Sequence, residues 1–96
     1  MPSETLHRSR LGLSIDKSDW MKEYTITGYP KKEFTVREFD SAYDFEEFIK
    51  EKVSCKDIDF DSEFCQFFAY AKTEKRAKKF LEEIEEYFQK VTNMLK

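Results

Sequence analysis

The stretch that decides the fold is TEKRAKKFLEEIEEYFQKVTNMLK, residues 73–96. Its apolar residues recur in three columns spaced seven residues apart, which is typical of one broad face of a helix. The columns are Ala77, Ile84 and Val91; Phe80, Tyr87 and Met94; and Leu81, Phe88 and Leu95. Three apolar positions in every seven favour packing on a sheet over the narrower seam of a coiled coil. The sequence therefore predicts a helix from about Glu74 to Leu95, with Thr73 as its N-cap.

The middle of the chain predicts a hairpin followed by a second helix. β-Branched and aromatic residues lie on both sides of a Gly-Tyr-Pro-Lys-Lys turn at residues 28–32, in which the proline fixes φ. The two strands of this hairpin are expected over residues 24–28 and 33–39. Ser41, with an aspartate three residues later, forms a variant capping box, and apolar residues follow it at helical spacing. We therefore expect a helix over residues 42–53.

Two more strands are expected before the last helix. Ile58 and Phe60 alternate with aspartates, which predicts a short strand whose acids face away from the core. A longer strand is expected over residues 64–72, where small alanines leave room for helices to approach one face. The residues assigned to that core face are Cys65, Phe67, Ala69 and Ala71, joined by Tyr24, Ile26, Phe34 and Val36.

The predicted element order is ββαββα, which defines an α+β fold. We expect a two-layer sandwich, with a four-stranded antiparallel sheet and two helices on one face, in a permuted ferredoxin-like arrangement. Residues 1–20 are polar and are interpreted as an N-terminal arm, partly ordered, before a single domain over residues 21–96. If the arm docks, the alternating Leu11, Leu13 and Ile15 would add a strand or cover the open side of the sheet.

Composition limits the function classes. The chain of 96 residues has a formal net charge of -3, so bulk attraction to nucleic acid or anionic lipid is not expected. No apolar stretch approaches the ~20 residues that span a bilayer, and two cysteines in an acidic chain are typical of reduced thiols, so we expect a cytoplasmic protein without membrane contact. His7 is the only histidine, and a calcium-loop match at residues 57–61 lacks the required glycine and glutamate. We therefore expect no metal, no cofactor and no enzymatic activity.

The sheet face opposite the helices is the first candidate binding surface. Its expected side chains combine aromatic rings with cations, which suits a protein interface and also base stacking. The residues assigned to protein binding on this face are Phe64, Phe68, Tyr70 and Arg37, and Phe39 is expected beside them. The alternative is that the arm or a second copy of the chain covers the face, because monomers rarely expose large apolar areas.

An acidic band is the second candidate. Residues 38–63 hold ten acids against three lysines, a net charge of -7, whereas the segments on either side each sum to +2. Such a band suits a basic protein surface and accelerates association at low salt. The alternative is that it serves solubility alone. The protein-binding residues assigned here are Asp57, Asp59, Asp61 and Glu63.

A basic cluster around the start of the last helix is the third candidate. Its residues are Lys72, Lys75, Arg76, Lys78 and Lys79. Cations at a helix N-terminus are repelled by its partial positive charge unless an anion compensates, so the cluster suggests a bound phosphate. The alternative is that Lys78 pairs with Glu82 and Lys79 with Glu83, four residues further along the helix.

These patterns favour a small non-enzymatic protein that acts as an adaptor, inhibitor or regulatory subunit by binding a protein partner. A nucleic-acid-binding domain that uses the basic cluster is the alternative function. Homodimerisation is a further hypothesis, because a last helix of about 33 Å would be longer than a short-stranded sheet needs to cover.

Overall fold

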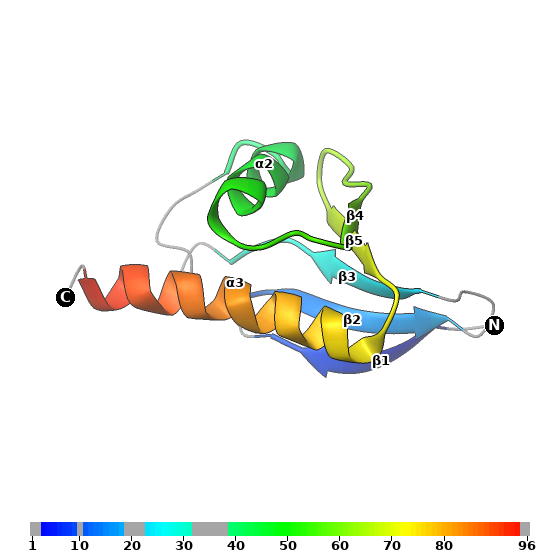
Figure 1. The fold of residues 1–96 in the computed structure, drawn as a ribbon. Coiled ribbons are helices and arrows are strands. Elements are labelled where there is room, and N and C mark those ends of the chain that lie inside the picture. The colour runs from blue at the N-terminus through cyan, green and yellow to red at the C-terminus, as the bar shows by residue number, and fades with distance from the viewer. Residues whose placement is uncertain (1–2, 10, 19–22, 32–38, 95–96) are drawn as a thin grey trace.

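The computed structural model describes residues 3–9, 11–18, 23–31 and 39–94. In these ranges the elements are β1 (Ser3–Arg8), β2 (Leu13–Ser18), β3 (Tyr24–Gly28), α2 (Ala42–Lys52), β4 (Asp59–Phe60), β5 (Phe67–Ala71) and α3 (Glu74–Met94). The strands form one sheet in the order β1-β2-β3-β5-β4, and every neighbouring pair is antiparallel (Figure 1). The predicted α+β class is confirmed, but the predicted count of four strands is wrong because the described part of the sheet has five.

The difference in strand number comes from the segment interpreted as an arm. Residues 3–9 and 11–18 form the β1–β2 hairpin, and β2 pairs directly with β3. Leu11, Leu13 and Ile15 are 4%, 1% and 0% exposed, so their alternation marks a true core strand. The expected strand over residues 33–39 lies outside the described residues except for Phe39. Its predicted hairpin with residues 24–28 is wrong, because β3 pairs with β2 on one side and with β5 on the other. The prediction of a domain over residues 21–96 alone stays untested, and the core shared with β2 leads us to expect that this segment needs the hairpin.

The register of the sheet separates its two faces cleanly. On one face a line of side chains runs across four strands, and its members are Ile15, Ile26, Ala69 and Phe60. Both helices pack on this face. The ring of Phe45 on α2 meets Phe67 on β5 at 5.1 Å, and the ring of Phe80 on α3 meets Phe60 on β4 at 6.1 Å. The expected placement of two helices on one side of the sheet is therefore what the described residues show.

The two helices begin where their caps predict. The Ser41 hydroxyl accepts a hydrogen bond from the Asp44 amide at 3.3 Å, and α2 ends before Val53, within one residue of the prediction. The Thr73 hydroxyl accepts one from the Arg76 amide at 3.1 Å, as expected for the N-cap of α3. The buried residues of α3 belong to the predicted stripe, and they are Ala77, Phe80, Leu81, Ile84 and Phe88. In Figure 1, α3 runs along the sheet and its C-terminal part extends past the strands.

Two residues were assigned to the wrong side of the sheet. Cys65 was expected in the core but is exposed, because the Glu63 amide bonds to the Gln66 carbonyl at 2.8 Å in a tight turn and β5 begins only at Phe67. Phe39 was expected on the opposite face but is 9% exposed and lies in the core. Its ring packs edge-on against Phe45 at 5.1 Å.

Candidate protein-binding face

The sheet face that points away from α2 and α3 is called the open face here. Its side chains alternate with the core residues along each strand, and no described helix lies on it. They are Ser14, Asp16, Thr25, Thr27, Phe68, Tyr70, Asp59 and Asp61. The face is therefore polar toward β2 and aromatic and acidic toward β4.

Acidic and aromatic side chains meet at the β4 edge of the open face. Asp59 stands opposite Tyr70 in the ladder, and the Asp61 amide donates to the Phe68 carbonyl at 3.0 Å. Because side chains directly opposite on antiparallel strands share a face, each aspartate lies beside a ring. Burial raises the pKa of Tyr70, and the charges of Asp61, Glu23 and Glu63 raise it further. The acidic band and the aromatic face, expected as separate surfaces, are thus continuous.

The structure places the other predicted protein-binding residues elsewhere. Asp57 is exposed in the turn before β4, where its φ of 64° lies in the left-handed region. Phe64 is 62% exposed in the β4–β5 turn, and its carbonyl accepts a hydrogen bond from the Ala42 amide at 2.9 Å, which ties that turn to the start of α2. Arg37 lies outside the described residues. The continuous set is therefore Asp59, Asp61, Phe68 and Tyr70, with Glu63 in the adjoining turn.

The basic cluster is partly used to hold the fold together. The Arg76 guanidinium donates to the Lys56 carbonyl at 2.8 and 3.1 Å and to the Ser54 carbonyl at 3.1 Å. It also lies 5.9 Å from the centre of the Phe80 ring. Arg76 therefore fastens the loop after α2 onto α3, and its donors point at carbonyls.

The lysines of the cluster differ among themselves. Lys78 pairs with Glu74 at 2.9 Å, one turn back along α3, whereas the expected partner was Glu82, one turn ahead. Lys72, Lys75 and Lys79 are exposed. A pair between a cation and the acid of the first turn offsets part of the repulsion from the helix N-terminus, so a bound phosphate is not required to explain these charges.

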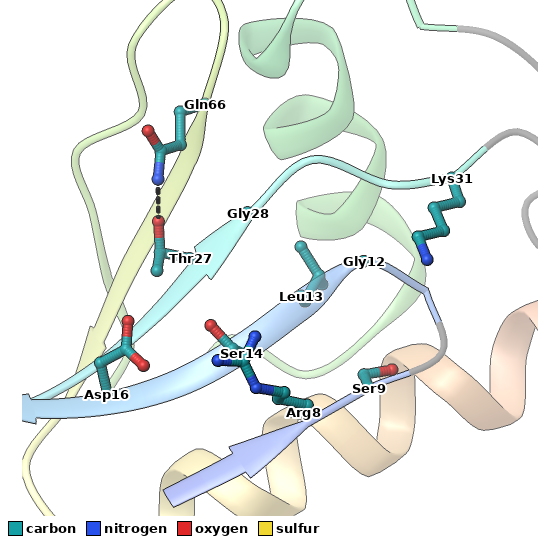
Figure 2. Close-up of a pocket in the computed structure, with 10 residues that line it drawn as sticks. All are labelled: Arg8, Ser9, Gly12, Leu13, Ser14, Asp16, Thr27, Gly28, Lys31 and Gln66. Atoms are coloured by element: carbon teal, nitrogen blue, oxygen red, sulfur yellow. Dashed lines mark hydrogen bonds between the residues drawn. The ribbon is translucent and has the colours of Figure 1, made fainter. Parts of the chain in front are cut away.

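Sequence reasoning missed a group of open-face residues at the other end of the sheet. Ser14 and Asp16 alternate with buried residues on β2, and together with Arg8 and Lys31 they line a hollow of about 530 Å³ (Figure 2). The signal was present, because an alternating strand over residues 11–16 puts its even-numbered residues on one face. Interpreting this segment as an arm concealed it.

The described residues form neither a metal-binding cluster nor a membrane-spanning helix. Across the described ranges, no three His, Cys, Asp or Glu side chains come together in a way that could hold a metal ion. Neither of the described helices has both the length and the apolar character needed to span a bilayer. The expectations of no metal and no enzymatic activity stay predictions.

Comparisons with other proteins add no family to this description. Protein-family models, curated proteins and solved structures were each compared with the chain, and none of the three comparisons found a significant match. The function is therefore inferred from the residues and geometry of this chain.

Proposed function

We propose that this protein is a non-enzymatic adaptor, inhibitor or regulatory subunit that binds a basic protein partner through the open face. One observation carries the proposal: Asp59 and Asp61 stand beside Tyr70 and Phe68 on a sheet face on which no described helix lies. The acids and the rings belong to one continuous surface, so a single partner can contact both.

The chemistry of this surface indicates which class of partner it can bind. Exposed carboxylates attract lysine and arginine side chains and accelerate encounter, and this contribution weakens as salt rises. Tyrosine and phenylalanine rings supply apolar contact area and can also bind a cation over the ring face. A partner that presents Lys or Arg together with apolar side chains fits both properties, whereas an acidic partner or a nucleic-acid backbone would be repelled by the aspartates.

Nucleic-acid binding through the basic cluster remains the alternative function. Two residues of the basic cluster already have partners within the fold, because Arg76 donates to the Lys56 and Ser54 carbonyls and Lys78 pairs with Glu74. Lys72, Lys75 and Lys79 would carry such binding. This alternative predicts an affinity that falls steeply with salt and is removed by nuclease treatment.

Three further expectations belong to this proposal. The permuted ferredoxin-like arrangement remains an interpretation of the five-stranded sheet. The cytoplasmic location, inferred from the reduced thiols, also remains an expectation. Homodimerisation through the end of α3 that extends past the strands is a hypothesis as well, and light scattering that shows a monomer over a hundredfold dilution would remove it.

A photo-crosslinking experiment tests the docking proposal. A benzophenone amino acid replaces Phe68 on the open face or, as a control, the exposed Glu82 on α3, and cross-linking is done in native lysate after nuclease treatment. We expect one abundant adduct with a basic protein at position 68 and none at position 82. The adduct should fade when the identified partner is tested at high salt.

A matched pair of charge variants tests the role of the acids. The change D59N/D61N removes two open-face charges, and E82Q/E86Q removes two exposed charges from α3. We expect the first variant to weaken binding of the cross-linked partner about tenfold or more, and the second to leave it within about twofold. Equal losses in the two variants, or an adduct that requires nucleic acid, would overturn the proposal.

A further inference from the structure

The hollow at the β1–β2 end of the open face has the dimensions of a small-molecule site. Its volume of about 530 Å³ falls in the range of roughly 300 to 1,000 Å³ occupied by organic ligands in proteins. It is built by the turn that joins β1 to β2, by the middle of β2, by the end of β3 and by Gln66 (Figure 2). It adjoins the acidic and aromatic edge along β4, because its lining residue Thr27 stands opposite Phe68 in the ladder.

The frame of this hollow is rigid backbone. Gly12 and Gly28 have φ values of +96° and +139°, and the two residues approach so closely that a Cβ on Gly28 would collide with the Gly12 carbonyl. The Lys31 amide donates to the Leu11 carbonyl at 2.7 Å, which holds the chain after β3 against the β1–β2 turn. The backbone that carries the lining groups is thus held in place without a ligand.

The charges that line the hollow favour an anion. Arg8 and Lys31 are both exposed cations at its wall, and Asp16 is the one acid among the described residues that line it. Neutral hydrogen-bonding groups come from Ser14, Thr27 and the Gln66 amide. An arginine guanidinium offers paired donors that match carboxylate and phosphate oxygens.

Asp16 adds a second requirement. Its Oδ1 is closed off from solvent and accepts no hydrogen bond from any described residue. The nearby Gln66 amide is directed elsewhere, because it donates to the Thr27 hydroxyl at 2.8 Å (Figure 2). A ligand in the hollow cannot reach this closed-off oxygen, but an O–H or N–H group that donates to the part of Asp16 lining the hollow would offset the cost of leaving Oδ1 unpaired.

We propose that the hollow binds a small organic anion, a phosphate monoester or a carboxylate, that also carries a hydroxyl or amino group. Arg8 and Lys31 bind the anionic end, and Asp16 accepts a hydrogen bond from the donor end. Ser14, Asp16 and Thr27 belong to the open face, but the hollow uses none of Asp59, Asp61, Phe68 and Tyr70, the residues that carry the proposed partner docking.

Calorimetric titration of the full chain tests this site with four probes: inorganic phosphate, glycerol phosphate, malate and glycerol. We expect glycerol phosphate or malate to bind more tightly than inorganic phosphate, and glycerol alone not to bind. Glycerol phosphate and malate distinguish a phosphate ligand from a carboxylate ligand. Amide shifts in NMR spectra should concentrate on residues 8–16 and 27–31.

Two variants and one control separate the roles of the lining residues. R8Q should weaken the binding of every anion about tenfold or more. D16N should strengthen the binding of inorganic phosphate, because it removes one negative charge from the hollow. It should also reduce the preference for hydroxylated anions. K90Q makes the same charge change as R8Q on α3 and should match the wild type.

Two results would overturn the proposal. One is the absence of saturable binding for every anion at about 10 mM, which corresponds to less than 3 kcal/mol of binding free energy. The other is a D16N variant that keeps the full preference for hydroxylated anions. If D16N does not fold, the R8Q titration and the location of the amide shifts still decide the question.

Discussion

The two faces of the sheet use alternate residues of the same strands, yet one holds the fold together and the other is left for contact. Ile15 and Ala69 are completely buried beneath the helices, whereas their chain neighbours Asp16 and Tyr70 lie on the open face. One step along a strand therefore changes the expected consequence of a substitution. On the core face it changes stability, and on the open face it changes binding.

The largest expected effect comes from removing residues 1–20. Leu11, Leu13 and Ile15 contribute roughly 1.5 to 3 kcal/mol each when buried, or roughly 5 to 9 kcal/mol together. A domain of this size has only about 5 to 15 kcal/mol of total stability. We expect residues 21–96 to lose cooperative thermal unfolding, as measured by circular dichroism.

The point variant I15N provides the control for this deletion, because it keeps the chain length while it places an amide in the core. It should destabilise the protein strongly, whereas S14N, one position away on the open face, should change little. A fragment of residues 21–96 that melts near the temperature of the full chain would show that the hairpin is an accessory layer.

Phe45 is the centre of the aromatic core. Its ring lies 5.1 Å from both Phe39 and Phe67 and 6.4 Å from Phe88, so it joins α2 to the sheet and to α3. We expect Phe45→Ala to lower the free energy of unfolding by about 3 to 5 kcal/mol, because it leaves a cavity among these rings.

Urea denaturation measures this effect, and Tyr43→Ala on the same helix is the matched control. Tyr43 is 50% exposed, so its loss should cost under about 1 kcal/mol. Similar losses for the two variants would contradict the division of α2 into a core side and a solvent side.

Substitution of Arg76 should have a smaller effect on stability, because Arg76 holds a loop and lies on neither face of the sheet. Replacing it with glutamine removes the donors that hold the Lys56 and Ser54 carbonyls against α3. Hydrogen bonds from charged groups contribute about 1.5 to 3 kcal/mol, and partial exposure reduces this, so we expect a loss of about 1 to 2 kcal/mol in urea denaturation. Lys75→Gln, an exposed neighbour, should remain within about 0.5 kcal/mol of wild type. If both variants match the wild type, Arg76 is not a structural clasp.

The elements that sequence predicted well are those whose signals are local. The stripe of α3 and the caps Ser41 and Thr73 each lie within a few residues, and the structure reproduces them. The β1–β2 hairpin was harder, because its apolar residues are few and its charged residues resemble a solvated tail. Its strands are defined by pairing with β3, a contact that composition alone does not reveal.

The candidate site was predictable in part for the same reason. The alternation of Phe68 and Tyr70 with Phe67 and Ala69 placed the rings on the correct face. The prediction that Cys65 lies on the core face was wrong because a turn at residues 63–66 interrupts the alternation. The meeting of the aspartates with the rings depends on the register of β4 against β5, which no local pattern encodes.

The smallest effect, and the one that sharpens the contrast between faces, comes from Tyr70. Tyr70→Phe should change stability by under about 0.5 kcal/mol at neutral pH, because only the hydroxyl is lost from a partly exposed ring. The pKa of Tyr70 is raised by burial and by Asp61, Glu23 and Glu63. The folded state therefore holds the phenolic proton more tightly than the unfolded state, whose pKa is about 10. The stability that comes from keeping Tyr70 protonated is fully present below about pH 10. It is lost as the pH rises through the raised pKa of the folded state.

Urea denaturation from about pH 8 to about pH 11 checks this sign. Burial also raises the pKa of the Cys55 thiol, which produces a decline in the same direction, so the informative quantity is the difference between wild type and Tyr70→Phe. We expect the wild type to lose stability more steeply than the variant above about pH 10. Parallel curves would mean that neither burial nor the charges of Asp61, Glu23 and Glu63 raise the pKa of Tyr70 in solution, so the ring would not lie against the acids of the open face.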